Sequence, residues 1–229
     1  MAAIKAKTEE TIEIRPLKRS IAKIRIVGDS PLIIHAWSEK AKREMLEAQQ
    51  TQKKTKTKKK DAKVPVADFI NSLYWLTEKP ETDGKKDDEL EWKYEEALQN
   101  GARFGFPVMA IKKAANSAAY RNGWVRNQME LRGAYFLRSE FNGLAEIISD
   151  EPPVMREDMV RVNLGKADIR YRGQFNSWHI DLTMEYNENG NISLNDIINC
   201  INAGGYSVGV GEWRPEKDGE YGRFHVESC

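Results

Sequence analysis

The run Trp178-His-Ile-Asp-Leu-Thr-Met-Glu-Tyr186 alternates apolar and polar residues without a break. A period of two places alternate side chains on opposite faces of an extended chain, so this run predicts a half-buried β-strand. Residues Ala22 to Ile26 alternate in the same way and predict a first strand near the N-terminus. Further strands are expected at three places, which are residues 160–164, 206–210 and 222–226.

Two prolines predict the starts of helices, because the first helical turn leaves its N–H groups unpaired and proline has none. Pro65 precedes apolar residues at helical spacing, which are Val66, Phe69, Ile70, Leu73 and Tyr74. Pro107 precedes a second such set, which is Val108, Ile111, Ala115, Ala118 and Ala119. In this second helix, the residues expected to point outward or to flank the core are Lys112, Lys113, Asn116 and Arg121.

Three further helices are expected. Ser193 and Asp196 resemble a capping box at the start of one of them, which Gly204-Gly205 would end. Ser38 can cap another through about Gln50, and a short one is expected from Leu90 to Leu98, after a polar loop that carries Asp87, Asp88 and Glu89.

Strand, helix and strand recur in both halves of the chain, which favours an α+β fold of the ferredoxin-like (RRM-like) type. Its antiparallel sheet would carry helices on one face. Residues 1–20 are expected to be an N-terminal arm and residues 21–229 a single domain, with a helical, lysine-rich insertion at about 51–100. Within that insertion the like charges of Lys53 to Lys60 predict a mobile loop.

Composition excludes several classes of protein. The chain has 229 residues, 31% of them charged, and its apolar runs are far shorter than the roughly 20 residues of a membrane-spanning helix. The first ten residues include two acids and no apolar stretch, so we expect a cytoplasmic protein without a leader. Cys200 and Cys229 are too few for a disulfide framework or a zinc site, and we expect no metal or cofactor.

Charge is clustered along the chain. Residues 101–139 hold seven Lys or Arg against one Glu. They also include Trp124, Tyr135 and Phe136, and cations interleaved with aromatic rings are typical of surfaces that bind single-stranded nucleic acid. A second candidate segment is the glycine-rich stretch from Gly204 to Pro215, since glycines let a backbone approach a phosphate closely. The predicted contact residues are Arg103, Lys112, Lys113, Arg121, Gly204, Gly205, Gly209, Gly211 and Arg214.

Three segments together carry a resemblance. They are Asp29-Ser-Pro-Leu-Ile-Ile-His35 after the first strand, Phe106-Pro-Val-Met-Ala-Ile-Lys-Lys-Ala-Ala115 at the start of the middle helix, and the glycines from Gly204 to Gly211. In this layout the chain resembles the RAMP superfamily of CRISPR RNA-binding proteins, and its backbone subunits most closely. It is also similar to phage-encoded proteins of this layout, which would place it in a bacterial host's cytoplasm. The resemblance implies a non-catalytic subunit that binds single-stranded RNA or DNA as one of several copies in an assembly.

Two other functions stay open. Some RAMP endoribonucleases are similar in placing a catalytic histidine near the N-terminus, which would give His35 that role in RNA cleavage. His179 and His225 are expected at the surface without a partner, and Cys200 is expected to be a partly buried small apolar residue. Alternating blocks of charge would also suit a structural or assembly protein that never binds nucleic acid.

Overall fold

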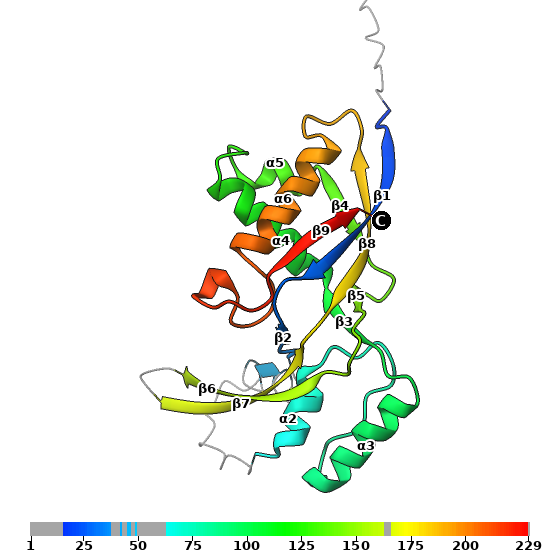
Figure 1. Ribbon diagram of the computed structural model, residues 1–229, viewed down its shortest axis with the longest axis vertical. Helices are drawn as coiled ribbons and strands as arrows, with labels where there is room; N and C mark the ends of the chain where they lie inside the picture. Colours follow the sequence, from blue (N-terminus) through cyan, green and yellow to red (C-terminus); the bar gives the residue numbers. More distant parts are fainter. Residues whose placement is uncertain are drawn as a thin grey trace, which may run out of the picture.

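The computed structural model describes residues 16–37, 63–162 and 166–228, together with Lys42, Met45, Leu46 and Gln49. The protein is an α+β molecule with antiparallel sheets (Figure 1). Its largest sheet has four strands in the order β4-β8-β1-β9. These strands are β1 (Arg19–Gly28), β4 (Tyr135–Arg138), β8 (His179–Asn187) and β9 (Phe224–Ser228).

The predicted alternation decides which face of this sheet is buried. β1 and β8 pair with Ile24 opposite Leu182 and Ile26 opposite Ile180, and all four side chains lie in the core. Lys23 and Arg25, the residues before and after Ile24 on β1, face the other way. The strands expected at residues 22–26 and 178–186 are therefore confirmed; β1 is longer than predicted at both ends, and β8 is displaced by one residue toward the C-terminus.

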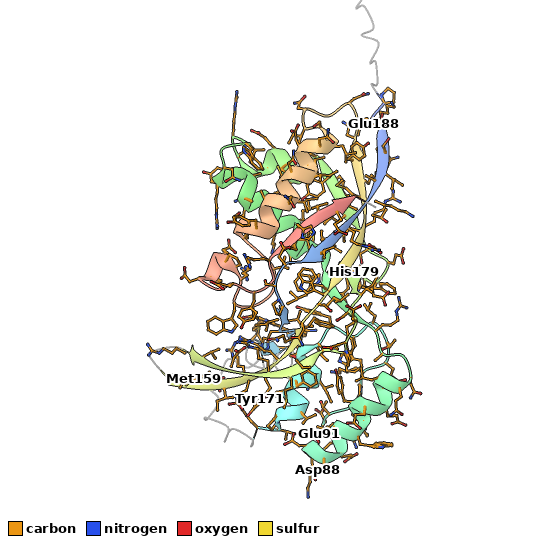
Figure 2. All side chains as sticks on the ribbon, in the orientation of Figure 1. Asp88, Glu91, Met159, Tyr171, His179 and Glu188 are labelled. Atoms are coloured by element: carbon orange, nitrogen blue, oxygen red, sulfur yellow. The ribbon has the colours of Figure 1, made fainter. Side chains whose placement is uncertain are left out.

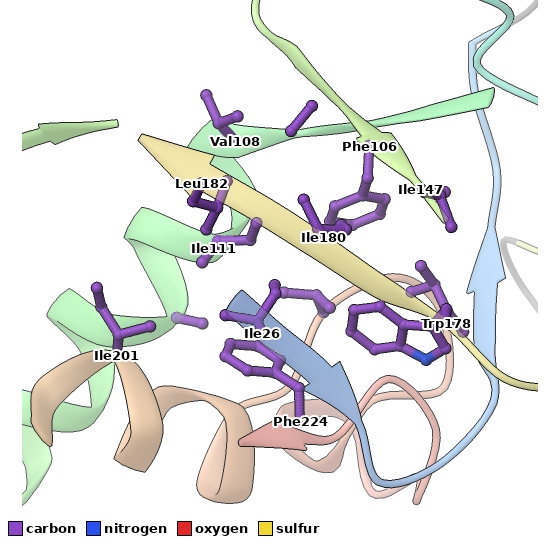
Figure 3. Close-up of a cluster of buried hydrophobic side chains, with 14 of the residues drawn as sticks. Ile26, Phe106, Val108, Ile111, Ile147, Trp178, Ile180, Leu182, Ile201 and Phe224 are labelled. Atoms are coloured by element: carbon purple, nitrogen blue, oxygen red, sulfur yellow. The ribbon is translucent and has the colours of Figure 1, made fainter. Parts of the chain in front are cut away.

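Two helices cover the buried face of the sheet. They are α4 (Val108–Arg121) and α6 (Leu194–Ser207), and the short α5 (Gln128–Arg132) packs beside α4. Figure 3 shows the core between helices and sheet, where Ile111 and Ile201 meet the strand residues Ile26 and Phe224. The predicted capping box is confirmed, since the Ser193 side chain accepts from the Asp196 N–H and the Asp196 side chain accepts from the Ser193 N–H.

A second group of elements lies below this unit in Figure 1. It contains a three-stranded sheet in the order β2-β7-β6, with α2 packed on β7 and α3 packed on α2, and the two-stranded pair β3-β5 joins the groups. One continuous set of buried side chains includes residues of both groups. The bounds are β2 (Leu32–Ile34), α2 (Pro65–Ser72), α3 (Asp87–Gln99), β3 (Phe104–Pro107), β5 (Leu144–Ile147), β6 (Val154–Val162) and β7 (Lys166–Phe175).

The prediction that Gly204-Gly205 ends a helix is wrong, because α6 continues through both glycines to Ser207. A Cβ atom on Gly204 would lie 2.6 Å from the backbone nitrogen of Ala115, and one on Gly205 would lie 2.0 Å from the carbonyl oxygen of Phe224. Glycine therefore serves here to bring α6 close to α4 and β9, not to stop the helix.

Other expectations also need correction. Residues 206–210 form the end of α6 and the loop after it, not a strand. Asp87 to Glu89 form the first turn of α3, where Asp87 accepts from the Val66 N–H, and do not lie in a loop. The helix expected from Ser38 lies mostly outside the described residues, and Lys53 to Lys60 lie wholly outside them.

Side chains from the helices occupy both edges of the four-stranded sheet. The Lys112 ammonium of α4 donates to the Tyr135 carbonyl of β4 over 2.6 Å. At the opposite edge the side-chain oxygen of Asn202, in α6, accepts from the Val226 N–H of β9 over 2.9 Å. None of the described helices has the length and apolar character needed to cross a membrane.

Candidate nucleic-acid interface

The outward side of α4 carries one continuous stripe of side chains. Positions three to four residues apart on a helix share a face, and here they are Met109, Lys113, Ser117, Tyr120 and Arg121. Trp124 follows in the turn after the helix. Tyr120 and Trp124 are 52% and 54% exposed, although aromatic residues of this size usually lie largely inside a protein. We call these residues, with Arg126 and Arg132, the α4 stripe.

The cations of the stripe are only partly neutralised. Arg132 donates to the Gln128 amide oxygen over 2.7 Å. Within the described residues no ion pair joins Lys113, Arg126 or Arg132 to a carboxylate, and the Glu130 side chain accepts from the Arg126 backbone N–H instead. This part of the surface therefore keeps a positive potential that would attract phosphate.

Glu216 joins the stripe to the loop after α6. It accepts from Arg121 over 2.8 Å and from Arg214 over 2.8 Å, and Arg214 also donates to the Gly211 carbonyl over 3.0 Å. The hydrogen bond from Arg214 holds the pKa of Glu216 below its usual value, with Arg121 adding to the effect. The structure thus brings together two predicted cations, Arg121 and Arg214, around one carboxylate.

Lys112 differs from its neighbour Lys113. Lys112 and Asn116 were expected to point outward or to flank the core. Both are buried, and Lys112 is only 7% exposed, so the expectation is wrong for these two residues. The Lys112 ammonium lies 4.9 Å and 4.6 Å from the ring centroids of Tyr135 and Phe136. Burial lowers the pKa of Lys112. The long aliphatic part of the Lys112 side chain is buried, and it carries the ammonium to the edge of β4.

The predicted glycines do not line the stripe as one loop. Gly204 and Gly205 lie at the contacts between α6 and its neighbours. Gly209 and Gly211 have positive φ values of 68° and 75°, and a side chain on Gly211 would meet the Ile33 carbonyl. Their backbones support the fold of the loop that carries Arg214.

Arg103 lies apart, beside a hollow of about 680 Å³ on the sheet face that the helices leave open. It forms an ion pair with Glu146, which lines the hollow, and lies 5.1 Å from the Phe141 ring centroid. The other arginines here are paired as well, Arg25 with Asp181 and Arg138 with Glu185, each over 2.6 Å. Because these cations are compensated, the open face attracts phosphate less than the α4 stripe does.

His35 lines a separate pocket of about 480 Å³ between β2, α2 and β7. Lys63, Arg170 and Tyr171 also line it, and Nδ1 of His35 is buried with no hydrogen-bond partner among the described residues. Burial first, and Arg172 second, lower the pKa of His35. A neutral imidazole in such a pocket can accept a proton.

The remaining candidates have structural partners. His225 was expected to have none, but its Nδ1 lies 2.6 Å from the Asp29 carboxylate, so that expectation is wrong. His179 begins β8 (Figure 2) and is half-buried, and its backbone exchanges hydrogen bonds with that of Ile148. Cys200 is buried, and burial raises its pKa to about 11. Among the described residues no three His, Cys, Asp or Glu side chains are grouped to hold a metal ion.

No family model matches the chain, and no curated protein sequence matches it significantly.

Proposed function

We propose that the protein binds single-stranded RNA or DNA along the α4 stripe, without catalysis, as a repeated subunit of a nucleoprotein assembly. The observation that carries the proposal is the succession, along α4 and the turn after it, of exposed rings and of cations that no described carboxylate pairs with, which are Lys113, Tyr120, Trp124 and Arg126. Cations neutralise phosphates and exposed rings stack on bases whatever their identity, so little base specificity is expected.

The topology supports the ferredoxin-like part of the proposal. β1, α4 and β4 form one strand–helix–strand unit, and β8, α6 and β9 form another. The two units interleave as β4-β8-β1-β9, which is the strand order of ferredoxin-like folds, and their shared core supports a single domain. We also propose that the protein is RAMP-like, as its sequence resemblance implies, and that it is located in the cytoplasm.

Fluorescence anisotropy of labelled single-stranded RNA and DNA, titrated with protein at several salt concentrations, tests the proposal. Binding should weaken as salt rises, because phosphate neutralisation releases counterions. Lys113→Glu with Arg126→Glu should weaken it strongly and lower the salt slope by about 1.4, at roughly 0.7 per lost contact to a single strand.

The matched control is Lys23→Glu with Lys86→Glu, which changes the net charge equally. Lys23 lies on the open sheet face and Lys86 precedes α3, and both are exposed. Equal weakening by both pairs would mean that only net charge matters, and loss with the control pair alone would place the interface near Lys23 or Lys86 and not at the α4 stripe. An absence of binding at low salt would favour a structural or assembly protein.

The pocket of His35 supports a second candidate, RNA cleavage with His35 as the general base. The base would take the proton of a ribose 2′-hydroxyl as that oxygen bonds to the adjacent phosphorus, and the 5′-oxygen would leave with a proton from water, which gives a 2′,3′-cyclic phosphate and a 5′-hydroxyl. Cleavage of RNA but not DNA, lost in His35→Ala and kept in His179→Ala, would support this function. Intact RNA after incubation with the wild-type protein would exclude it.

A further inference from the structure

β6 is an outer strand with one face that lacks cover. In the β2-β7-β6 sheet, β7 pairs with one edge of β6, and no strand in the described part of the chain pairs with the other. An unpaired edge of this length presents N–H and C=O groups that can accept another strand. Figure 1 shows the hairpin of β6 and β7 extending away from the four-stranded sheet.

Side chains on the two faces of β6 differ in their surroundings. Arg156 and Asp158 point toward the molecule and are held in ion pairs, Arg156 to Asp158 and Asp158 to Arg172. The opposite face carries Met155, Glu157, Met159 and Arg161, all of them exposed. Met159 is 76% exposed, and its cross-strand neighbour Ile169 on β7 is 42% exposed. Figure 2 shows Met159 on the outer part of the hairpin.

Glu157 and Arg161 carry opposite charges at equal distances from Met159, on the same face. No ion pair joins either of them to another described residue, although the hydroxyl of Tyr171 is close enough to hydrogen bond with Glu157. An arrangement that is symmetric about one residue with opposite charges on its two sides is complementary to itself when rotated by a two-fold axis.

We infer that two copies of this chain associate through antiparallel pairing of β6 with β6, with Met159 at the two-fold axis. In this register Glu157 faces the partner's Arg161, and Arg161 faces the partner's Glu157. The two Met159 side chains meet at the centre and continue outward to Ile169 on each side, so an apolar row crosses the joined sheet. Opposite charges and apolar pairs directly across antiparallel strands are both stabilising.

The charges also select the register. A shift that places Glu157 opposite the partner's Glu157, or Arg161 opposite the partner's Arg161, brings like charges together. A shift of the register by two residues in either direction places neither Glu157 nor Arg161 opposite a residue of opposite charge. A shift by one residue moves the side chains of one strand to the other face of the sheet. The symmetric register around Met159 alone gives two ion pairs. This association involves no residue of the α4 stripe and goes beyond the proposed function.

Sedimentation velocity of the full chain without nucleic acid, over a range of concentrations, tests the inference. The wild type should change with concentration from the 26.2 kDa monomer toward twice that mass. Glu157→Arg and Arg161→Glu should each raise the dissociation constant at least tenfold, because each places like charges opposite one another twice. The double exchange, Glu157→Arg with Arg161→Glu, should restore the dimer.

The rescue by the double exchange separates strand pairing from a folding defect. A wild type that stays monomeric at every concentration would overturn the inference, and so would single variants that dimerise as the wild type does.

Oxidative cross-linking gives a second readout. With Cys229→Ser to remove the terminal thiol, Met159→Cys should form a disulfide-linked dimer, since directly opposed residues lie within disulfide reach. Ile169→Cys is the matched control, because strand spacings place the two copies of residue 169 about 14 Å apart. Cross-linking at both positions, or at neither, would contradict the register.

Discussion

Arg172 donates a hydrogen bond to the carboxylate of Asp158 over 3.0 Å, although both side chains are almost completely shielded from water. Arg156 donates to the other oxygen of the same carboxylate over 2.8 Å, and Arg172 also donates to Glu212, in the loop after α6. These bonds join the β6-β7 hairpin to the unit that carries the α4 stripe. Burial by itself would raise the pKa of Asp158, but the bonds from Arg156 and Arg172 outweigh it and lower the pKa.

Replacing Asp158 by Asn should be strongly destabilising. The change keeps the side chain's shape but removes the carboxylate that Arg156 and Arg172 share, so that only Glu212 remains to compensate the two positive charges. The expected cost is about 3–5 kcal/mol in the free energy of unfolding. Urea denaturation measures it. The control is Asp181→Asn, whose partner Arg25 is far more exposed, and there the loss should stay below about 1 kcal/mol. Comparable losses in the two variants would show that the buried ion pairs contribute no more to the free energy of unfolding than the exposed one does.

Lys112→Met should destabilise the fold, whereas Lys113→Met should not. The first change leaves the Tyr135 carbonyl without its donor, which costs about 1–3 kcal/mol for a buried group. Lys113 is exposed, so the second change should stay within about 0.5 kcal/mol of the wild type. Thermal and urea unfolding compare the two. Equal stability in the two variants would mean that the buried Lys112 ammonium contributes nothing to the free energy of unfolding.

Gly204→Ala should destabilise the protein even though alanine favours helices by about 1 kcal/mol over glycine. The new Cβ would lie 2.6 Å from the Ala115 nitrogen, and separating α4 from α6 should cost about 1–3 kcal/mol beyond that gain. Gly133→Ala is the control, because nothing lies within 4 Å of a Cβ at that position. A rise in melting temperature for Gly204→Ala would refute the close-contact explanation.

His225 should make a small part of the stability depend on pH. Its hydrogen bond to Asp29, with a smaller effect from Glu227, raises the pKa of His225 above its usual 6.5. A raised pKa in the folded state stabilises the protein below pH 6.5, and this contribution is lost as the pH rises through the raised value.

Because His225 is well exposed, the difference should stay below about 1 kcal/mol. It is measured by comparing the wild type with His225→Gln between pH 5.5 and 8.5, because the contribution of every other titrating group is common to both proteins. The wild type should lose more stability on going to the higher pH, and parallel pH profiles would contradict the assignment.

Elements with strong periodicity could be predicted from the sequence. β1, β8, α2 and α4 follow from alternation or helical spacing, and the start of α6 follows from its cap. β7 was missed although its polar and apolar residues alternate; its polar position Arg172 is buried, where residues distant in sequence, Asp158 and Glu212, neutralise it. The end of α6 was misjudged because glycine, a frequent helix terminator, was needed for a contact that only the folded chain creates.

The candidate site was predicted only in part. The basic and aromatic composition of residues 101–139 indicated the segment that carries the α4 stripe, and Lys113 and Arg121 are on it. Composition could not separate Lys112 from Lys113, since the difference depends on the edge of β4 passing beside one of them. The exposed positions of Tyr120 and Trp124 and the link of Arg121 to Arg214 through Glu216 depend on tertiary packing.

The helix side chains at the two edges of the four-stranded sheet also bear on how the protein is made. Synthesis proceeds from the N-terminus, so Lys112 leaves the ribosome before β4, and Asn202 leaves it before β9. Each outer strand therefore emerges after the residue that will occupy its free edge. When each outer strand is made, the nascent chain therefore already contains the residue that will protect its edge. That residue can block pairing with other nascent chains on the same messenger RNA.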